Sequence, residues 1–180
     1  MRALLDACVL YPTVLRELLT GCAGLGLFTP LWSDRILEEW ARATRKLGPG
    51  AEPIARSEIA ALRAAFPEAV VRESPGLAAR LHLPDENDIH VLAAAITGSA
   101  DCIVTFNRAD FPRGVLAAEG LDRHDPDAFL WSLASHHPDA VAQVAEGVRA
   151  KAEAISGTAQ PLRALLKRAK LPRLAKLLTA

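Results

Sequence analysis

Paired cysteines and long apolar runs are missing from this chain of 180 residues, and each absence excludes a class of protein. The three cysteines (Cys8, Cys22 and Cys102) are an odd number without a Cys-x-x-Cys motif, which excludes a disulfide framework and a zinc knuckle. No apolar run approaches the length of a membrane span, and Asp6 interrupts the first run too early for a signal peptide. We therefore expect a cytoplasmic protein with reduced thiols and no membrane partner.

Aromatic residues are also scarce, at 5% of the chain, whereas hydrophobic residues reach 51%. The core must therefore be built from aliphatic side chains, and disorder is excluded as a global state. The net charge of zero conceals an asymmetry, because residues 161–180 carry six basic residues and no acidic one. The remaining 160 residues hold 15 basic and 21 acidic residues, so an acidic body precedes a basic end. This split predicts different partners for the two parts.

Short apolar segments alternate with helical patterns through the first two thirds of the chain. Strands are expected at 3–5, 69–71 and 102–106, and the apolar segment at 27–32 fits either a turn or a short strand. Helices are expected at 14–19, 33–47, 52–65 and 86–97, with Ser33 as the N-cap of the second. This alternation predicts an α/β fold with a parallel sheet. From residue 125 onward the chain looks helical, and its prolines divide that stretch into several helices.

Carboxylates stand at several of the predicted boundaries. Asp6 follows the first strand, Asp85 and Asp88 begin the helix at 86–97, and Asn107 and Asp110 follow the strand at 102–106. In a parallel sheet, ligands bind beyond the carboxyl ends of the strands, where Asp6 and Asn107 are expected. Oxygen ligands without Cys or His suit Mg²⁺ or Mn²⁺, which serve phosphoryl chemistry. Taken singly, each acid also fits a helix cap or turn residue, so only the set points to a metal site.

Four segments of this chain, in order, together resemble the PIN domain, a metal-dependent nuclease fold. They are LLDACVL at 4–10, WSDRILEEW at 32–40, LPDENDIHVLAAA at 83–95 and IVTFNRADFP at 103–112. The last two segments resemble the subgroup with a TFNxxDFP-like strand end, and the helical C-terminal part looks like the extension of some VapC-type toxins. The resemblance implies a three-layer α/β/α sandwich with a parallel sheet over residues 1–125, followed by an α-helical C-terminal extension at 126–180.

The resemblance also assigns roles by position. It implies that four acids are catalytic and hold Mg²⁺ or Mn²⁺, namely Asp6, Glu39, Asp88 and Asp110. Asn107 stands where many PIN domains have an Asp, and Asp85 is an extra acid that can compensate for the missing charge, so both join the expected metal ligands. Ser33 and Thr105 are expected to hydrogen-bond behind the ligands, although an N-cap and a strand residue explain them equally well. The choice between Glu38 and Glu39 stays open.

The implied reaction is hydrolysis of an RNA phosphodiester by a ribonuclease, as in the toxin of a type II toxin–antitoxin pair. The expected partners are RNA, a cognate antitoxin and a second copy of the chain. Four basic residues of the C-terminal helices are candidates for contacting RNA or a partner: Arg163, Lys167, Arg168 and Lys170. A docked helix with solvated lysines is the alternative. A degenerate PIN module that binds without cutting is the second hypothesis, favoured by Asn107. A phosphatase with Asp6 as nucleophile ranks last, because Cys8 replaces the second Asp of that motif.

Overall fold

The computed structural model describes residues 1–72 and 74–179 and groups the chain into two compact units. Met1–Tyr11 and Phe28–His124 form the first unit, and Pro12–Leu27 and Asp125–Ala180 form the second. The second unit thus combines the C-terminal helices with a segment from near the N-terminus. The expected domains at 1–125 and 126–180 stay a prediction, and the last residue of that expected extension lies outside the described residues.

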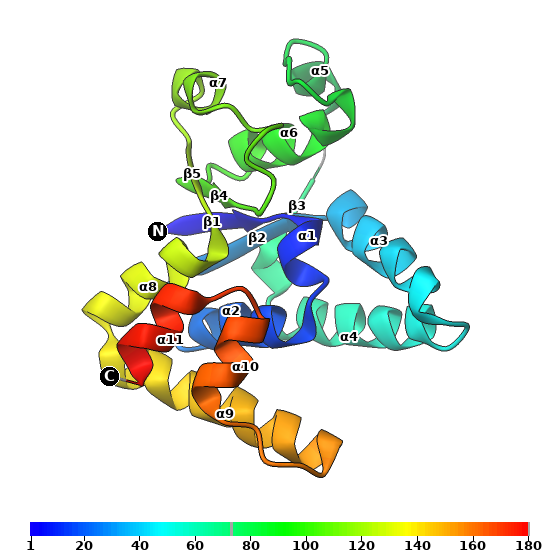
Figure 1. Ribbon diagram of the computed structural model, residues 1–180. Helices are drawn as coiled ribbons and strands as arrows, with labels where there is room; N and C mark the ends of the chain where they lie inside the picture. Colours follow the sequence, from blue (N-terminus) through cyan, green and yellow to red (C-terminus); the bar gives the residue numbers. More distant parts are fainter. Residues whose placement is uncertain (73, 180) are drawn as a thin grey trace. The chain divides into compact units, whose positions relative to one another are not determined.

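Within the described residues, a parallel sheet of five strands forms the centre of the first unit (Figure 1). The strands follow the order β3-β2-β1-β4-β5 and comprise β1 (Arg2–Leu5), β2 (Thr29–Ser33), β3 (Val70–Val71), β4 (Cys102–Val104) and β5 (Asp122–His124). Leu4 of β1 pairs with Leu31 of β2 on one side and with Ile103 of β4 on the other. All three are buried, as the strands of a sheet covered on both faces should be.

Helices cover both faces of this sheet. On one face α6 (Ile89–Thr97) contacts β1, β2 and β4, and α4 (Ala51–Ala65) lies on the opposite side (Figure 1). The side chain of Ser33 caps α3 (Asp34–Ala43) as predicted, because its Oγ accepts a hydrogen bond from Ile36 N at 3.2 Å. The remaining helical segments of this unit are short: α1 (Ala7–Leu10), η1 (Thr44–Leu47), η2 (Pro67–Ala69), α5 (Pro75–Ala78), η3 (Glu86–Asp88) and α7 (Arg113–Ala118).

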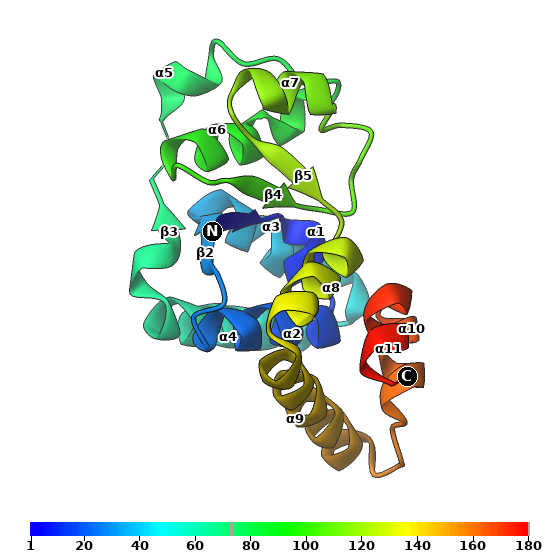
Figure 2. The ribbon, with the colours of Figure 1, turned by 90° about the vertical axis from the view of Figure 1, so that its left-hand side faces the viewer.

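Among its described residues, the regular elements of the second unit are all helices, joined by short turns (Figure 2). It comprises α2 (Thr13–Gly24), α8 (Pro126–His136), α9 (Pro138–Ser156), α10 (Leu162–Arg168) and α11 (Pro172–Leu178). Proline occupies the first turn of α8, α9 and α11, where its missing N–H costs nothing. The helices α2 and α9 approach closely at Gly21, where an added Cβ would lie 2.6 Å from Val144 Cγ1. Among the described helices, none is long and apolar enough to cross a lipid bilayer.

The α/β architecture, the parallel sheet and the run of C-terminal helices confirm the fold expected from the sequence. Pro172 separates α10 from α11, as predicted. Among the described residues, the elements that were not predicted include α1, η2, α5, α7 and the edge strand β5. The residues of β5 are Asp122, Arg123 and His124, which lack any apolar pattern because the strand lies at the sheet edge and none of them is buried.

Candidate metal centre

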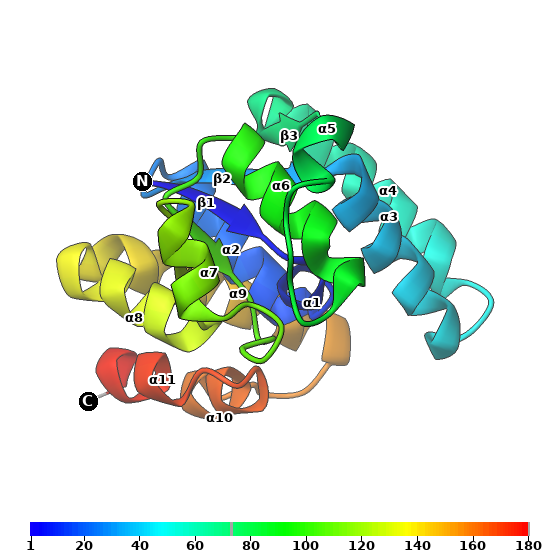
Figure 3. The ribbon, with the colours of Figure 1, turned by 90° about the horizontal axis from the view of Figure 1, so that it is seen from above.

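The strand order reverses beside β1, and the candidate site lies at that point. Asp6 directly follows β1, and Thr105 and Asn107 follow the neighbouring strand β4. A backbone hydrogen bond of 3.2 Å from Asp6 N to Val104 O holds the two strand ends side by side. Seen from above in Figure 3, β1 points toward α1 and the beginning of α6. In open α/β sheets the crevice at such a reversal is the usual ligand site.

Asp6 occupies the N-cap position of α1, but its side chain makes no capping hydrogen bond. The carboxylate instead accepts a hydrogen bond of 2.6 Å from Thr105 Oγ1, and Asn107 N donates to the same hydroxyl at 2.9 Å. Cys8 Sγ also donates to Asp6 Oδ2, at 3.1 Å. Thr105 is fully buried, so the orientation of Asp6 is fixed from inside the protein. Thr105 therefore holds Asp6 by a hydrogen bond, and its expected role behind a metal ligand stays a prediction.

Asn107 joins two further carboxylates. Its Nδ2 donates to Asp88 Oδ2 at 3.0 Å and to Asp110 Oδ2 at 2.6 Å, while its Oδ1 accepts from Asp110 N at 3.4 Å. The amide nitrogen rather than the oxygen thus faces the acids. In this arrangement Asn107 contributes hydrogen-bond donors to the site, where an Asp would add a negative charge.

The acidic cluster consists of Asp85, Asp88 and Asp110. Each offers one carboxylate oxygen, and the three oxygens lie within 4.8 Å of one another. Asp85 also caps η3, because its carboxylate accepts a hydrogen bond of 2.9 Å from Asn87 N. The same residue is thus both a helix cap and a member of the acidic cluster. Carboxylate oxygens at this spacing are the ligands that Mg²⁺ and Mn²⁺ prefer, and the donor set therefore fits such an ion.

Burial and electrostatic repulsion between the acids raise the pKa of Asp88. Burial, followed by the negative charges of Asp6, Asp85 and Asp110, raises the pKa of Asp88 from 3.8 to about 6, against a smaller opposing effect of His90. The neighbouring Cys8 thiol has its pKa raised to about 12, first by burial and then by the charge of Asp6. A divalent cation would relieve this repulsion at Asp88, whereas Cys8 stays a neutral thiol at physiological pH.

Glu39 lies outside the acidic cluster and contacts two basic side chains. Its Oε1 is 2.9 Å from His90 Nε2 and 3.3 Å from Arg35 Nε. Burial tends to raise the pKa of Glu39, but the contacts with His90 and Arg35 outweigh it and the pKa is lowered. Glu39 is therefore ionised at neutral pH and reaches toward α6, which begins directly after Asp88.

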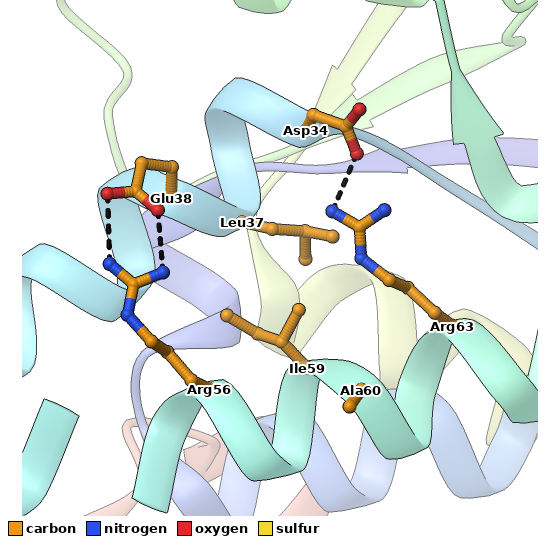
Figure 4. Close-up of a pocket in the computed structure, with 7 residues that line it drawn as sticks. All are labelled: Asp34, Leu37, Glu38, Arg56, Ile59, Ala60 and Arg63. Carbon is orange, nitrogen blue, oxygen red and sulfur yellow. Dashed lines mark hydrogen bonds and ion pairs between the residues drawn. The ribbon is translucent and has the colours of Figure 1, made fainter. Parts of the chain in front are cut away.

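Glu38 faces a different part of the molecule. Figure 4 shows its carboxylate paired with Arg56 across the pocket between α3 and α4. The Oε2 to Nη1 distance is 2.8 Å, and Arg42 Nε donates to the other oxygen at 2.7 Å. Hydrogen bonds from Arg56 and Arg42 lower the pKa of Glu38 to about 2. Of the two adjacent glutamates, Glu38 belongs to the α3–α4 contact, and Glu39 is the one that contacts His90.

The remaining predicted residues lie elsewhere. Ser33 is buried as the cap of α3, and the structure places its hydroxyl against Ile36 N. The four basic candidates belong to α10 and the turn after it, in the second unit; Arg168 Nη2 donates to Gln160 Oε1 at 2.5 Å, and Arg163 and Lys167 are exposed.

Sequence reasoning missed three residues that shape the site. Cys8 contacts both Asp6 and Thr105, His90 contacts Glu39, and Arg123 Nη1 holds the loop before α7 by donating to Arg108 O at 2.6 Å and Phe111 O at 2.8 Å. Their motifs gave little signal, because a thiol two residues after an acid and a lone histidine in an apolar helix usually have packing roles.

A family model described as PIN domain matches residues 2–109 of the chain, which is more than half of its length. The chain belongs to the PIN domain family. No curated protein and no solved structure matches the chain. PIN domains are in general metal-dependent nucleases, and the acidic cluster of this PIN domain supplies oxygen ligands of the kind that such chemistry needs.

Proposed function

We propose that this PIN domain is an endoribonuclease that hydrolyses RNA phosphodiester bonds with Mg²⁺ or Mn²⁺. The observation that carries the proposal is the convergence of three carboxylate oxygens within 4.8 Å, together with the raised pKa of Asp88. Closely spaced carboxylates destabilise a fold through their mutual repulsion, whereas a cation site needs several carboxylates close together.

The acids and their hydrogen-bond partners have separate roles in this proposal. Asp85, Asp88 and Asp110 would hold the ion, and Asp6 and Glu39 are proposed as further ligands from outside that cluster. When bound, such an ion lowers the pKa of a water molecule and stabilises the charge on a phosphate. Thr105 keeps the Asp6 carboxylate in one orientation, and Asn107 does the same for Asp88 and Asp110. This fixed arrangement lets the chain place a phosphodiester without rearranging its ligands.

We further propose a biological role and a setting. The chain acts in the cytoplasm as a VapC-type toxin of a type II toxin–antitoxin pair, with a cognate antitoxin as its protein partner and a homodimer as its assembly. The sequence motifs quoted above support this finer assignment. The exposed Arg163 and Lys167, with Arg168 and Lys170, are the proposed contacts for RNA or a partner.

Cleavage of end-labelled cellular RNA tests the proposed reaction. The purified chain is incubated with Mn²⁺, with Mg²⁺ and with EDTA, beside Asp88→Asn and beside His82→Gln, which changes an exposed residue. We expect metal-dependent cleavage by the wild type and by His82→Gln, and a loss of at least about 100-fold in Asp88→Asn, the size of effect expected when a ligand essential for charge stabilisation is removed. Equal cleavage by Asp88→Asn would contradict the proposal.

A second function is favoured by one observation. The amide nitrogen of Asn107 donates hydrogen bonds to Asp88 and Asp110 where an Asp would add a further negative ligand, so the site offers less charge for a metal. A PIN module that binds RNA or a protein without cutting is therefore the alternative. It predicts RNA binding by wild type and Asp88→Asn with equal affinity, and no cleavage with any metal.

A further inference from the structure

The proposed reaction gives the imidazole of His90 no role. The residue is 8% exposed, and both of its ring nitrogens are inaccessible and lack a hydrogen-bond partner within the described part of the chain. Nε2 lies 2.9 Å from Glu39 Oε1, which is a hydrogen-bond distance, but the direction of the N–H bond falls short of hydrogen-bond geometry. Buried polar groups are nearly always paired, so an unpaired imidazole facing a carboxylate needs a reason.

Glu39 is held from two sides, by one exposed side chain and by one buried side chain. Arg35 comes from α3 itself, four residues before Glu39, and its side chain is 48% exposed. His90 comes from α6, two residues after Asp88, and its side chain is 7% exposed. Arg35 Nη2 also donates to Asn87 O at 3.5 Å, so both partners connect Glu39 to the segment that presents Asp88. The two differ in burial, and the buried ring of His90 has little freedom to move away.

The contacts also leave one oxygen of Glu39 for another ligand. Both Arg35 and His90 reach Oε1, so neither occupies Oε2. A carboxylate held through one oxygen presents the other in a defined direction, which is how outer partners orient the ligands of metal sites.

We propose that His90 is a positioning residue for Glu39. The imidazole, held by α6 with Nε2 2.9 Å from Oε1, aligns its N–H with that oxygen when Oε2 of Glu39 joins the ligands of the divalent cation, and so keeps Glu39 in place. The proposal rests on the proposed metal-dependent function. It needs a hydrogen-bond donor at Nε2 and no change in the protonation of His90.

Mn²⁺ affinity of the full chain, measured by calorimetric titration, tests this role in a double-mutant cycle. The variants are His90→Leu, Glu39→Gln and the two combined, with His82→Leu as the exposed matched control. We expect His90→Leu to weaken Mn²⁺ binding about 10- to 100-fold, the usual effect of removing a partner that orients a ligand. In the Glu39→Gln background, His90→Leu should cause no further loss, and His82→Leu should bind as the wild type.

A conservative variant separates positioning from packing. The amide of His90→Gln also donates a hydrogen bond, so this variant should recover most of the affinity that His90→Leu loses. Equal losses in His90→Gln and His90→Leu would assign His90 to packing and overturn the proposal. A loss that persists in the Glu39→Gln background would overturn it as well, because His90 would then act independently of Glu39.

An NMR measurement covers the case in which His90→Leu does not fold. The imidazole ¹⁵N resonances of His90 are recorded in the Mg²⁺-saturated wild type and in Glu39→Gln. We expect the Nε2 resonance to shift when Glu39 is changed, and an unchanged resonance would overturn the proposal. Wild-type protein without any Mn²⁺ affinity would refute the proposed function together with this role, whereas equal affinity of wild type and His90→Leu would refute the role of His90 alone.

Discussion

The hydroxyl of Thr105 connects the ends of β1 and β4 at the candidate site. It donates to Asp6 and accepts from Asn107 N, and no part of the residue is exposed. We expect Thr105→Val to lower the free energy of unfolding by about 1–3 kcal/mol, because it removes the acceptor of Asn107 N and leaves the Asp6 carboxylate with the weaker thiol donor of Cys8. Urea denaturation measures this, and Thr105→Ser, which keeps the hydroxyl, should retain most of the stability. A Thr105→Val protein as stable as Thr105→Ser would contradict the account.

Asp88 gives a prediction about pH. Its pKa in the folded chain is about 6, above the ordinary 3.8, so the folded state binds the proton more tightly than the unfolded state does. The contribution of this carboxyl to stability is therefore highest below pH 4 and falls as the pH rises from about 4 to about 6. Without metal, Asp88→Asn should melt on the order of a few degrees above the wild type at pH 7, and the difference should vanish near pH 4. A thermal melt series checks this, and a difference independent of pH would contradict it.

The sequence predicted which acids to examine at the residue scale, but not how each is held. Asp6, Asp85, Asp88 and Asp110 follow strand ends or begin helices, and those positions can be read from the sequence. The contact of Glu39 with His90 could not be predicted from the sequence, because it depends on the rotation of α6 relative to α3. Nor did the pattern distinguish Glu38 from Glu39, since a shift of one position on a helix turns the side chain by about 100°.

At the scale of elements, Asp127 shows how the C-terminal helices are joined. This buried residue of α8 accepts hydrogen bonds from Arg173 N at 2.9 Å and Leu174 N at 3.0 Å, at the first turn of α11. We expect Asp127→Ala to lower the free energy of unfolding by about 1–2 kcal/mol, as loss of a helix cap does, and to speed amide exchange in α11. Asp139→Ala, an exposed acid in the first turn of α9, is the matched control and should cost less. Unchanged exchange in α11 would contradict this role.

Helices and strands with a clear periodic pattern of apolar residues were predictable from the sequence. Elements that form only through pairing or packing with distant segments were not. Ser33 marked the beginning of α3, and the apolar run after Asp101 marked β4. The strand β5 forms because β4 offers a free edge, with Ile103 pairing with Arg123, and its own residues carry no signal for it. The grouping of α2 with the C-terminal helices was equally hidden, because it depends on contacts between residues far apart in sequence, such as Gly21 and Val144.

At the scale of the whole chain, the basic residues near the C-terminus are the feature to test. Leu165, Leu166 and Leu174 of α10 and α11 are buried, so deleting residues 161–180 would disturb packing as well as charge. We therefore predict the effect of replacing the exposed Arg163 and Lys167 with Gln in an Asp88→Asn background. RNA affinity at low salt should fall, and the slope of log affinity against log salt should decrease by about 0.7 for each RNA phosphate that the variant no longer neutralises.

Lys151→Gln is the matched control for this charge test, because Lys151 is also a cation of the second unit and pairs with Glu17. We expect it to leave the RNA salt slope unchanged. Equal slopes for Asp88→Asn with and without the Arg163→Gln and Lys167→Gln changes would contradict a role of these helices in binding RNA and leave them as docked helices with solvated cations.

The account depends on one claim, that the acidic cluster binds a divalent cation, and a calorimetric titration with Mn²⁺ at pH 7 tests it most directly. The wild-type chain is compared with Asp88→Asn, which removes one carboxylate from the three oxygens that lie within 4.8 Å. The account predicts saturable binding by the wild type and an affinity at least about 10-fold lower for Asp88→Asn, since an essential ligand is removed. Absence of binding by the wild type, or equal affinity of the two proteins, would contradict it.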